Sequence, residues 1–126
     1  MAEKVFLFHV EQEKVRKISA ITEKLPLSVV VVPVKDYGQR LGNLADVFGF
    51  LREDKSDSID AVPEEMMLMS GMSPEFLDRF LEVWKGLGIE PIDRKAVVTI
   101  DNINWTPRIL FQELDKEYQK MNQSEK

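Results

Sequence analysis

The chain has 126 residues, enough to bury one hydrophobic core, and its 44% hydrophobic and 31% charged residues are typical of a folded domain. It carries 22 Asp and Glu against 17 Lys and Arg, and the basic residues are scattered, which argues against a nucleic-acid partner. It has no cysteine, which excludes disulfides, thiolate nucleophiles and zinc or iron sites built on thiolates.

The sequence shows neither a targeting signal nor a membrane-spanning segment. Residues 1–5 lead directly into a short apolar run, without the basic region and long apolar stretch of a signal peptide. The longest apolar run, residues 27–34, is broken by Ser28 and Pro33 and is too short to cross a bilayer. We therefore expect a cytoplasmic protein that does not associate with a membrane.

The first half of the chain, residues 1–51, predicts the order strand, helix, strand, helix. A strand is expected at residues 5–9, and apolar positions then recur at helical spacing until Pro26. Residues 28–33 are rich in valine and apolar on both faces, which predicts a central strand covered on both sides. A second helix is expected to present one apolar face, formed by Leu41, Leu44, Phe48 and Leu51.

The second half, residues 62–121, repeats this order after the polar residues 52–61, which we interpret as a linker within a single domain spanning residues 1–126. Strands are expected at residues 66–70 and 95–100. Ser73-Pro74-Glu75 combines an N-cap hydroxyl, a proline suited to the first helical position and a carboxylate near the positive end of the helix dipole. Thr106-Pro107 predicts the start of the last helix in the same way.

These elements predict an α/β fold with a four-stranded, mainly parallel sheet and four helices, built from two β-α-β-α halves. The alternative is a ferredoxin-like mixed sheet, which the order of elements disfavours because that fold needs two consecutive strands. Asp36-Tyr37 precedes Arg40 as Asn104-Trp105 precedes Arg108, a pattern that favours an internal duplication. Any two β-α-β-α units share their order of elements, however, so the duplication stays a hypothesis.

The second half resembles a family of small bacterial domains, the domain of unknown function 3783. The resemblance rests on five segments: Met66–Met69, Pro74–Leu87, Lys95–Thr99, the turn Asn102-x-Asn104-Trp105-Thr106 and Leu110–Leu114. The first half matches only as a diverged copy, with Tyr37 in place of the tryptophan. The resemblance implies the architecture and a bacterial origin, but it implies no activity and no catalytic residues.

A parallel sheet would place both polar turns at the carboxyl ends of the strands, where open α/β sheets bind ligands. We therefore expect ligand-binding side chains at this edge: His9, Asp36, Tyr37, Asn102, Asn104 and Trp105. Asn and Asp are also ordinary turn residues, and Trp105 could instead close the top of the core. His9, the only histidine, could face Ser70 across this edge, although Ser70-Gly71 lacks the context of a nucleophile elbow.

No motif in the sequence predicts a cofactor or a metal, because glycine-rich phosphate loops and calcium-binding loops are missing. Without an assembled catalytic group, the sequence favours a non-enzymatic interaction or regulatory module. The alternative is a small-molecule binding domain or minor enzyme that uses the strand ends. The methionines of residues 66–72 are either buried filler or a contact surface, and at a sheet edge they would pair with another copy. The expected partners are a second copy of the chain or another protein.

Overall fold

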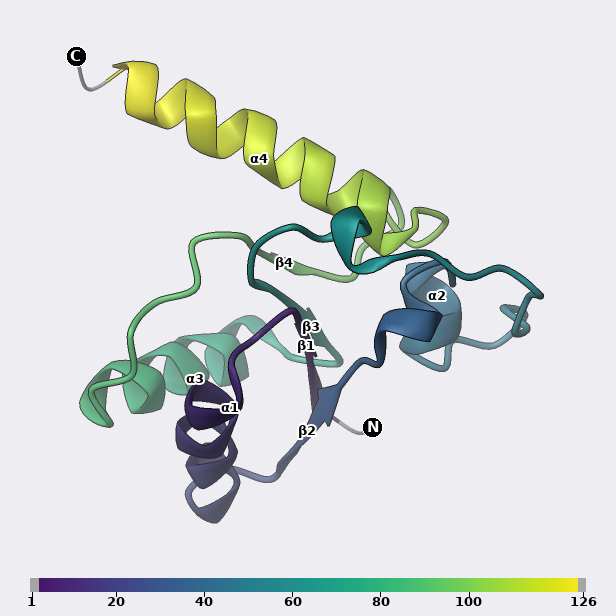
Figure 1. Cartoon of the computed structure of the whole chain (residues 1–126). Helices are drawn as coiled ribbons and strands as arrows, with labels where there is room; N and C mark the ends of the chain where they lie inside the picture. The colour runs from purple at the N-terminus through teal and green to yellow at the C-terminus, as the bar shows by residue number, and fades with distance from the viewer. Residues whose placement is uncertain (1–2, 125–126) are drawn as a thin grey trace.

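The sheet of this protein is mixed, with the strand order β2-β1-β3-β4 (Figure 1). The computed structural model describes residues 3–124, and within them the strands are β1 (Glu3–Phe8), β2 (Leu27–Val31), β3 (Met66–Ser70) and β4 (Lys95–Val97). β1 is parallel to β2 and β3 is parallel to β4, whereas the central strands β1 and β3 are antiparallel. The α/β class and the four strands are confirmed, but the mainly parallel sheet is wrong because the two parallel pairs run in opposite directions.

Helices cover both faces of the sheet. The first face carries α1 (Gln12–Ser19), the 3-10 turn η1 (Ala20–Glu23) and α3 (Pro74–Gly86). The second face carries α2 (Leu41–Leu44), α4 (Pro107–Ser124) and the 3-10 turns η2 (Val34–Asp36) and η3 (Ile59–Ala61). In residues 3–124, no helix is both long enough and apolar enough to cross a bilayer.

α3 begins where its capping residues predict, whereas α2 is shorter than its apolar pattern predicts. The Ser73 hydroxyl accepts the Phe76 N–H at 3.1 Å, and Pro74 is the first helical residue. α2 ends after one turn, because the backbone adopts a positive φ angle at Asp46 (59°) and again at Gly49 (93°), which a right-handed helix does not allow. Phe48 and Leu51 are consequently exposed, and the apolar helix face predicted for them is wrong.

The core is built on the two central strands, whose side chains alternate between the two faces. Val5, Leu7, Met67 and Met69 pack under α1 and α3, and Phe6, Phe8, Met66 and Leu68 pack on the second face. None of these eight side chains is more than 3% exposed. The methionine strand is therefore central and filled with core side chains, so it offers no edge to another copy.

β2, expected to be central, is instead an edge strand. Val31 is 54% exposed and Val30 is 36% exposed. A run of valines that is apolar on both faces suits a buried strand, but it does not fix which strands lie beside it. Here the apolar strands β1 and β3 form the centre of the sheet. Each of them pairs with a strand on both sides, whereas β2 pairs only with β1.

The polar segment 52–61 is held against both halves of the domain. The buried Gln39 amide donates to the carbonyls of Glu53 at 2.7 Å and Lys55 at 2.9 Å, and its oxygen accepts the Glu53 N–H at 2.9 Å. Asp57 forms a two-point ion pair with Arg108 of α4, with N–O distances of 2.8 and 2.6 Å. The segment is therefore tied to Gln39 of the first half and to Arg108 of the second.

Arg94 joins α4 to the segments that flank β3 and β4. Its side chain is buried, and its guanidinium lies 5.0 Å from the ring centre of Phe111 and 4.6 Å from that of Tyr118. It also forms ion pairs with Glu64 at 2.8 Å and with Asp115 at 2.6 Å. A buried guanidinium needs such partners because an unpaired buried charge is strongly unfavourable.

We predict that truncating the centre of β3 destabilises the fold far more than truncating an exposed apolar residue. Leu68→Ala should lower the free energy of unfolding by about 2–5 kcal/mol, since it leaves a cavity between β3 and the second-face helices. The matched control Leu51→Ala, at a side chain 83% exposed, should change it by less than about 0.5 kcal/mol. Urea unfolding followed by tryptophan fluorescence measures both, and equal losses in the two variants would contradict this picture of the core.

Candidate functional site

The mixed sheet divides the six side chains predicted to bind a ligand between two opposite edges. His9 follows β1, and the loop holding Asp36 and Tyr37 follows β2, at the edge where these two parallel strands end. β3 and β4 run the other way, so the loop holding residues 102–105 leaves from the opposite edge. The expectation of one shared edge is therefore wrong. A contact of 3.4 Å from Arg40 Nη1 to Asn104 Oδ1 joins the two loops over the second face.

The residues of the 102–105 loop have structural partners. Asn102 is buried, and its side chain accepts the Thr99 N–H at 2.8 Å and donates to the Val97 carbonyl at 2.9 Å. Trp105 is half-buried against the second-face core, and its carbonyl accepts the Leu41 N–H at the start of α2 at 2.8 Å. These two side chains shape a turn and cover the core, as ordinary turn chemistry allows.

His9 and Tyr37, predicted separately, are hydrogen-bonded to each other. His9 has a left-handed backbone (φ 56°), and its N–H donates to the Tyr37 hydroxyl at 2.8 Å. The Tyr37 ring is buried and packs tilted against Phe8, with 5.6 Å between ring centres. Burial raises the pKa of Tyr37 above its ordinary value, and the His9 N–H partly opposes this rise. Tyr37 therefore serves as a neutral anchor for the chain leaving β1.

The imidazole of His9 has a defined orientation. Its Nδ1 lies 2.7 Å from the Val62 carbonyl oxygen, which can only accept a hydrogen bond, so Nδ1 carries the proton. In the neutral ring, Nε2 then keeps its lone pair as an acceptor. Ser70 cannot act with this histidine, because it pairs with Lys4 at the far end of β1.

A groove of about 660 Å³ opens beside His9, at the carboxyl ends of β1 and β2. Most of its lining is apolar, and the rest comes from an imidazole, a phenol and two carboxylates: His9, Val10, Glu11, Val31, Val32, Pro33, Val34, Tyr37, Ile59 and Glu65. Of the side chains predicted from the sequence, those of His9 and Tyr37 line this groove. No signal in the sequence indicated Glu65 and Ile59 of the lining, because they come from the segment that precedes β3.

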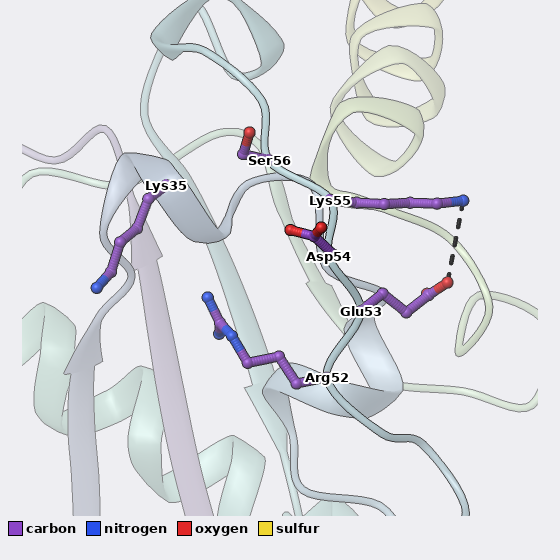
Figure 2. Close-up of a pocket in the computed structure, with 6 residues that line it drawn as sticks. All are labelled: Lys35, Arg52, Glu53, Asp54, Lys55 and Ser56. Atoms are coloured by element: carbon purple, nitrogen blue, oxygen red, sulfur yellow. Dashed lines mark ion pairs between the residues drawn. The ribbon is translucent and has the colours of Figure 1, made fainter.

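A second hollow, of about 430 Å³, lies between η2 and the segment 52–56 and is lined by charged side chains (Figure 2). In Figure 2, the side chains of Lys35 and Arg52 lie on the left, and the ion pair between Lys55 and Glu53 lies on the right. Arg52 also pairs with Asp36 at 2.6 Å, and Glu53 pairs with Arg40 at 3.0 Å. Asp36, one of the predicted ligand-binding residues, is thus held in an ion pair that braces this loop.

Within residues 3–124, no group of three or more His, Asp or Glu side chains is placed so that it could hold a metal ion. The groove beside His9 combines an imidazole and two carboxylates with exposed apolar side chains.

Comparison with known proteins finds a similarity in the second half of the chain. Residues 65–121 match the family model described as Domain of unknown function (DUF3783). The match covers β3, α3, β4 and most of α4, and it confirms the resemblance of this half. No curated protein and no solved structure matches the chain. The family description assigns no activity, and most of the groove lining lies outside the matched residues.

We predict that the Tyr37 hydroxyl stabilises the chain reversal at His9. Tyr37→Phe keeps the buried ring but leaves the His9 N–H without its acceptor, which should lower the free energy of unfolding by about 1–3 kcal/mol. Tyr118→Phe is the matched control, because the contact described for Tyr118 involves its ring and should be retained. Chemical denaturation measures both variants. A Tyr37→Phe protein as stable as its control would show that the hydroxyl is dispensable.

The ion pair between Asp57 and Arg108 predicts an acid-dependent contribution to stability. Arg108 holds the pKa of Asp57 below its ordinary value of 3.8. This stabilisation is present above the ordinary pKa and is lost as the pH falls through the lowered one. Asp57→Asn should therefore be less stable than the wild type at pH 7, with the difference shrinking as the pH falls below 3.8. Thermal unfolding between pH 2 and 7 tests this, with Asp78→Asn on α3 as control, and a difference independent of pH would refute it.

Proposed function

We propose that this protein is a non-enzymatic interaction module that binds an extended segment of a partner protein along the edge strand β2. The observation that carries the proposal is that β2 is an open edge of valines that ends at the groove beside His9. Addition of a strand to such an edge is a common mode of peptide recognition, in which the backbone supplies affinity and the side chains supply specificity.

The backbone of β2 offers the hydrogen bonds that this mode requires. The Val32 N–H donates to the Leu7 carbonyl, and backbone groups alternate between the two sides of a strand. The N–H and C=O groups of Val29 and Val31 therefore point away from β1. An incoming strand can form up to about four hydrogen bonds with these two residues.

The flanks of β2 limit how much of the edge can pair. Pro26 and Pro33 stand directly before and after the valine-rich run, and proline and lysine are the residues that commonly protect sheet edges. Between the prolines, residues 27–32 carry no charge. The other edge, β4, has three residues and begins with Lys95. β2 is thus the better docking strand, and it suits a segment of about five residues.

A partner segment fits this edge better than a permanent pairing of two copies. A stable protein interface buries about 1,000 Å² or more, and one short strand contributes only part of that surface. The groove beyond Val32 extends the surface that a flexible segment can follow. The alternative of a small-molecule site at the strand ends has less support, because its predicted residues lie at two opposite edges.

We also propose that the two halves are diverged copies. The Val32 N–H donates to Leu7 at 3.0 Å, and the Val98 N–H donates to Met69 at 2.9 Å in the equivalent position of the other parallel pair. The first residues of α2 and α4 each follow nine residues after these valines (41 − 32 and 107 − 98). This register aligns Tyr37 with Ile103, so the duplication is supported by geometry and not by the Tyr37 and Trp105 pattern.

We predict that an uncharged strand-forming peptide, acetyl-Thr-Val-Thr-Val-Thr-Val-Thr-amide, binds at β2. In an NMR titration of the full chain, the amide signals of Val29 and Val31 should shift most. Val31→Pro removes an outward N–H and should weaken binding at least about tenfold, the effect of losing one or two backbone hydrogen bonds. Val97→Pro, the equivalent change in β4, is the matched control and should leave binding at β2 unchanged.

Three outcomes would contradict the proposal. They are shifts centred on β4, full-strength binding to Val31→Pro, and self-association of the chain through β2 that excludes the peptide. If Val31→Pro unfolds, Val31→Lys serves instead, because it keeps every hydrogen bond to β1 and places a charge on the edge. Sedimentation measured over a range of protein concentrations reports the self-association.

A further inference from the structure

The groove at the end of β2 contains polar groups that mainly accept hydrogen bonds. Its charged side chains are those of Glu11 and Glu65, and its imidazole belongs to His9. No lysine or arginine is among its lining residues in the described chain. The His9 N–H already donates to Tyr37, and Nδ1 already faces the Val62 carbonyl. The Tyr37 hydroxyl accepts the His9 N–H and keeps one proton to donate. The other side-chain groups that the groove presents to a ligand are acceptors, namely the Nε2 lone pair of His9 and the carboxylate oxygens.

One of these carboxylates already binds an ammonium group. Lys14 Nζ lies 2.7 Å from Glu65 Oε1, in a partly buried ion pair. A carboxylate has two oxygens and about four acceptor sites, so Glu65 keeps capacity for a second donor. Glu11, the N-cap residue of α1, forms no side-chain hydrogen bond to that helix.

The walls of the groove suit a hydrocarbon chain. Val31, Val34 and Ile59 are 54%, 38% and 41% exposed, and all three line the groove. Lysine and arginine bury their methylene stems on apolar surface of this kind while their charged ends reach polar partners. A donor-rich cation on an aliphatic stem therefore matches both the walls and the acceptors. The net charge of −5 also attracts a basic segment over a longer range.

We infer that the partner segment carries a lysine or arginine beside the residues that pair with Val29 and Val31. The stem of this residue lies on Val31, Val34 and Ile59, and its cationic end is bound by Glu11, Glu65 and His9 Nε2. The inference rests on the proposed strand addition at β2, and it names the chemistry of the partner that this edge selects.

The test compares three peptides that share the core Val-Thr-Val-Thr-Val and have acetylated and amidated ends. Both ends carry lysine in the first peptide, norleucine in the second and glutamate in the third, so either strand direction is covered. Affinities are measured by NMR titration of the full chain. The lysine peptide should bind roughly three- to tenfold more tightly than the norleucine peptide, the range for a few partly exposed ionic hydrogen bonds. The glutamate peptide should bind most weakly.

A pair of double variants separates the groove from general charge attraction. Glu11→Gln with Glu65→Gln should remove the preference for lysine over norleucine. Glu75→Gln with Glu82→Gln makes the same change in net charge on α3, away from the groove, and should keep the preference. A preference that survives in the first double variant, or that is lost in the second, would overturn the inference.

The two proposals fail in distinguishable ways. If all three peptides shift Val29 and Val31 with equal affinity, strand addition stands and the basic residue is refuted. If no peptide binds at β2, strand addition itself fails and the inference falls with it. Binding of the lysine peptide in the groove without shifts at Val29 or Val31 would refute strand addition and point to a site for a free alkylammonium group.

Discussion

The antiparallel pairing of β1 with β3 is the constraint on which the rest of the structure depends. It joins the two most apolar strands, so that all eight core side chains on residues 5–8 and 66–69 lie between two helix layers. It also reverses the second half relative to the first. Each half supplies a parallel pair, and the pairing of their inner strands forces β2 and β4 to opposite edges. The direction of each strand then decides at which end of the sheet its following loop lies.

The reversal also makes the halves depend on each other. The loop after β2 crosses the second face until the N–H groups of Leu41 and Gly42 reach the carbonyls of Trp105 and Ile103. Four N–H groups at the start of any helix lack partners within it, and α2 is too short to stabilise itself. The 102–105 loop supplies acceptors for two of them. Residues that resemble ligand-binding groups in the sequence thus complete the start of a helix in the other half.

The sequence predicts the local elements well and their relative direction poorly. Ser73-Pro74 marks the start of α3 because capping is a local interaction, and the apolar runs mark all four strands. Nothing local distinguishes a parallel from an antiparallel neighbour, however, since β1 and β3 are apolar on both faces in either case. The make-up of the candidate site depends on these strand directions. His9 and Tyr37 meet because they follow parallel neighbours, whereas Glu65 enters the groove only because β3 runs the other way.

His9 shows how the core and the groove are coupled. A non-glycine residue in the left-handed region costs roughly 1–2 kcal/mol, and it persists only where the surroundings hold it. Two hydrogen bonds hold it here, from the His9 N–H to Tyr37 and from Nδ1 to Val62, and both partners are buried in the second-face core. The packing that buries Tyr37 and Val62 therefore also fixes the orientation of the His9 imidazole beside the groove. The core is built on β1 and β3, whereas β2 lies at the edge of the sheet, where the proposed partner segment would pair.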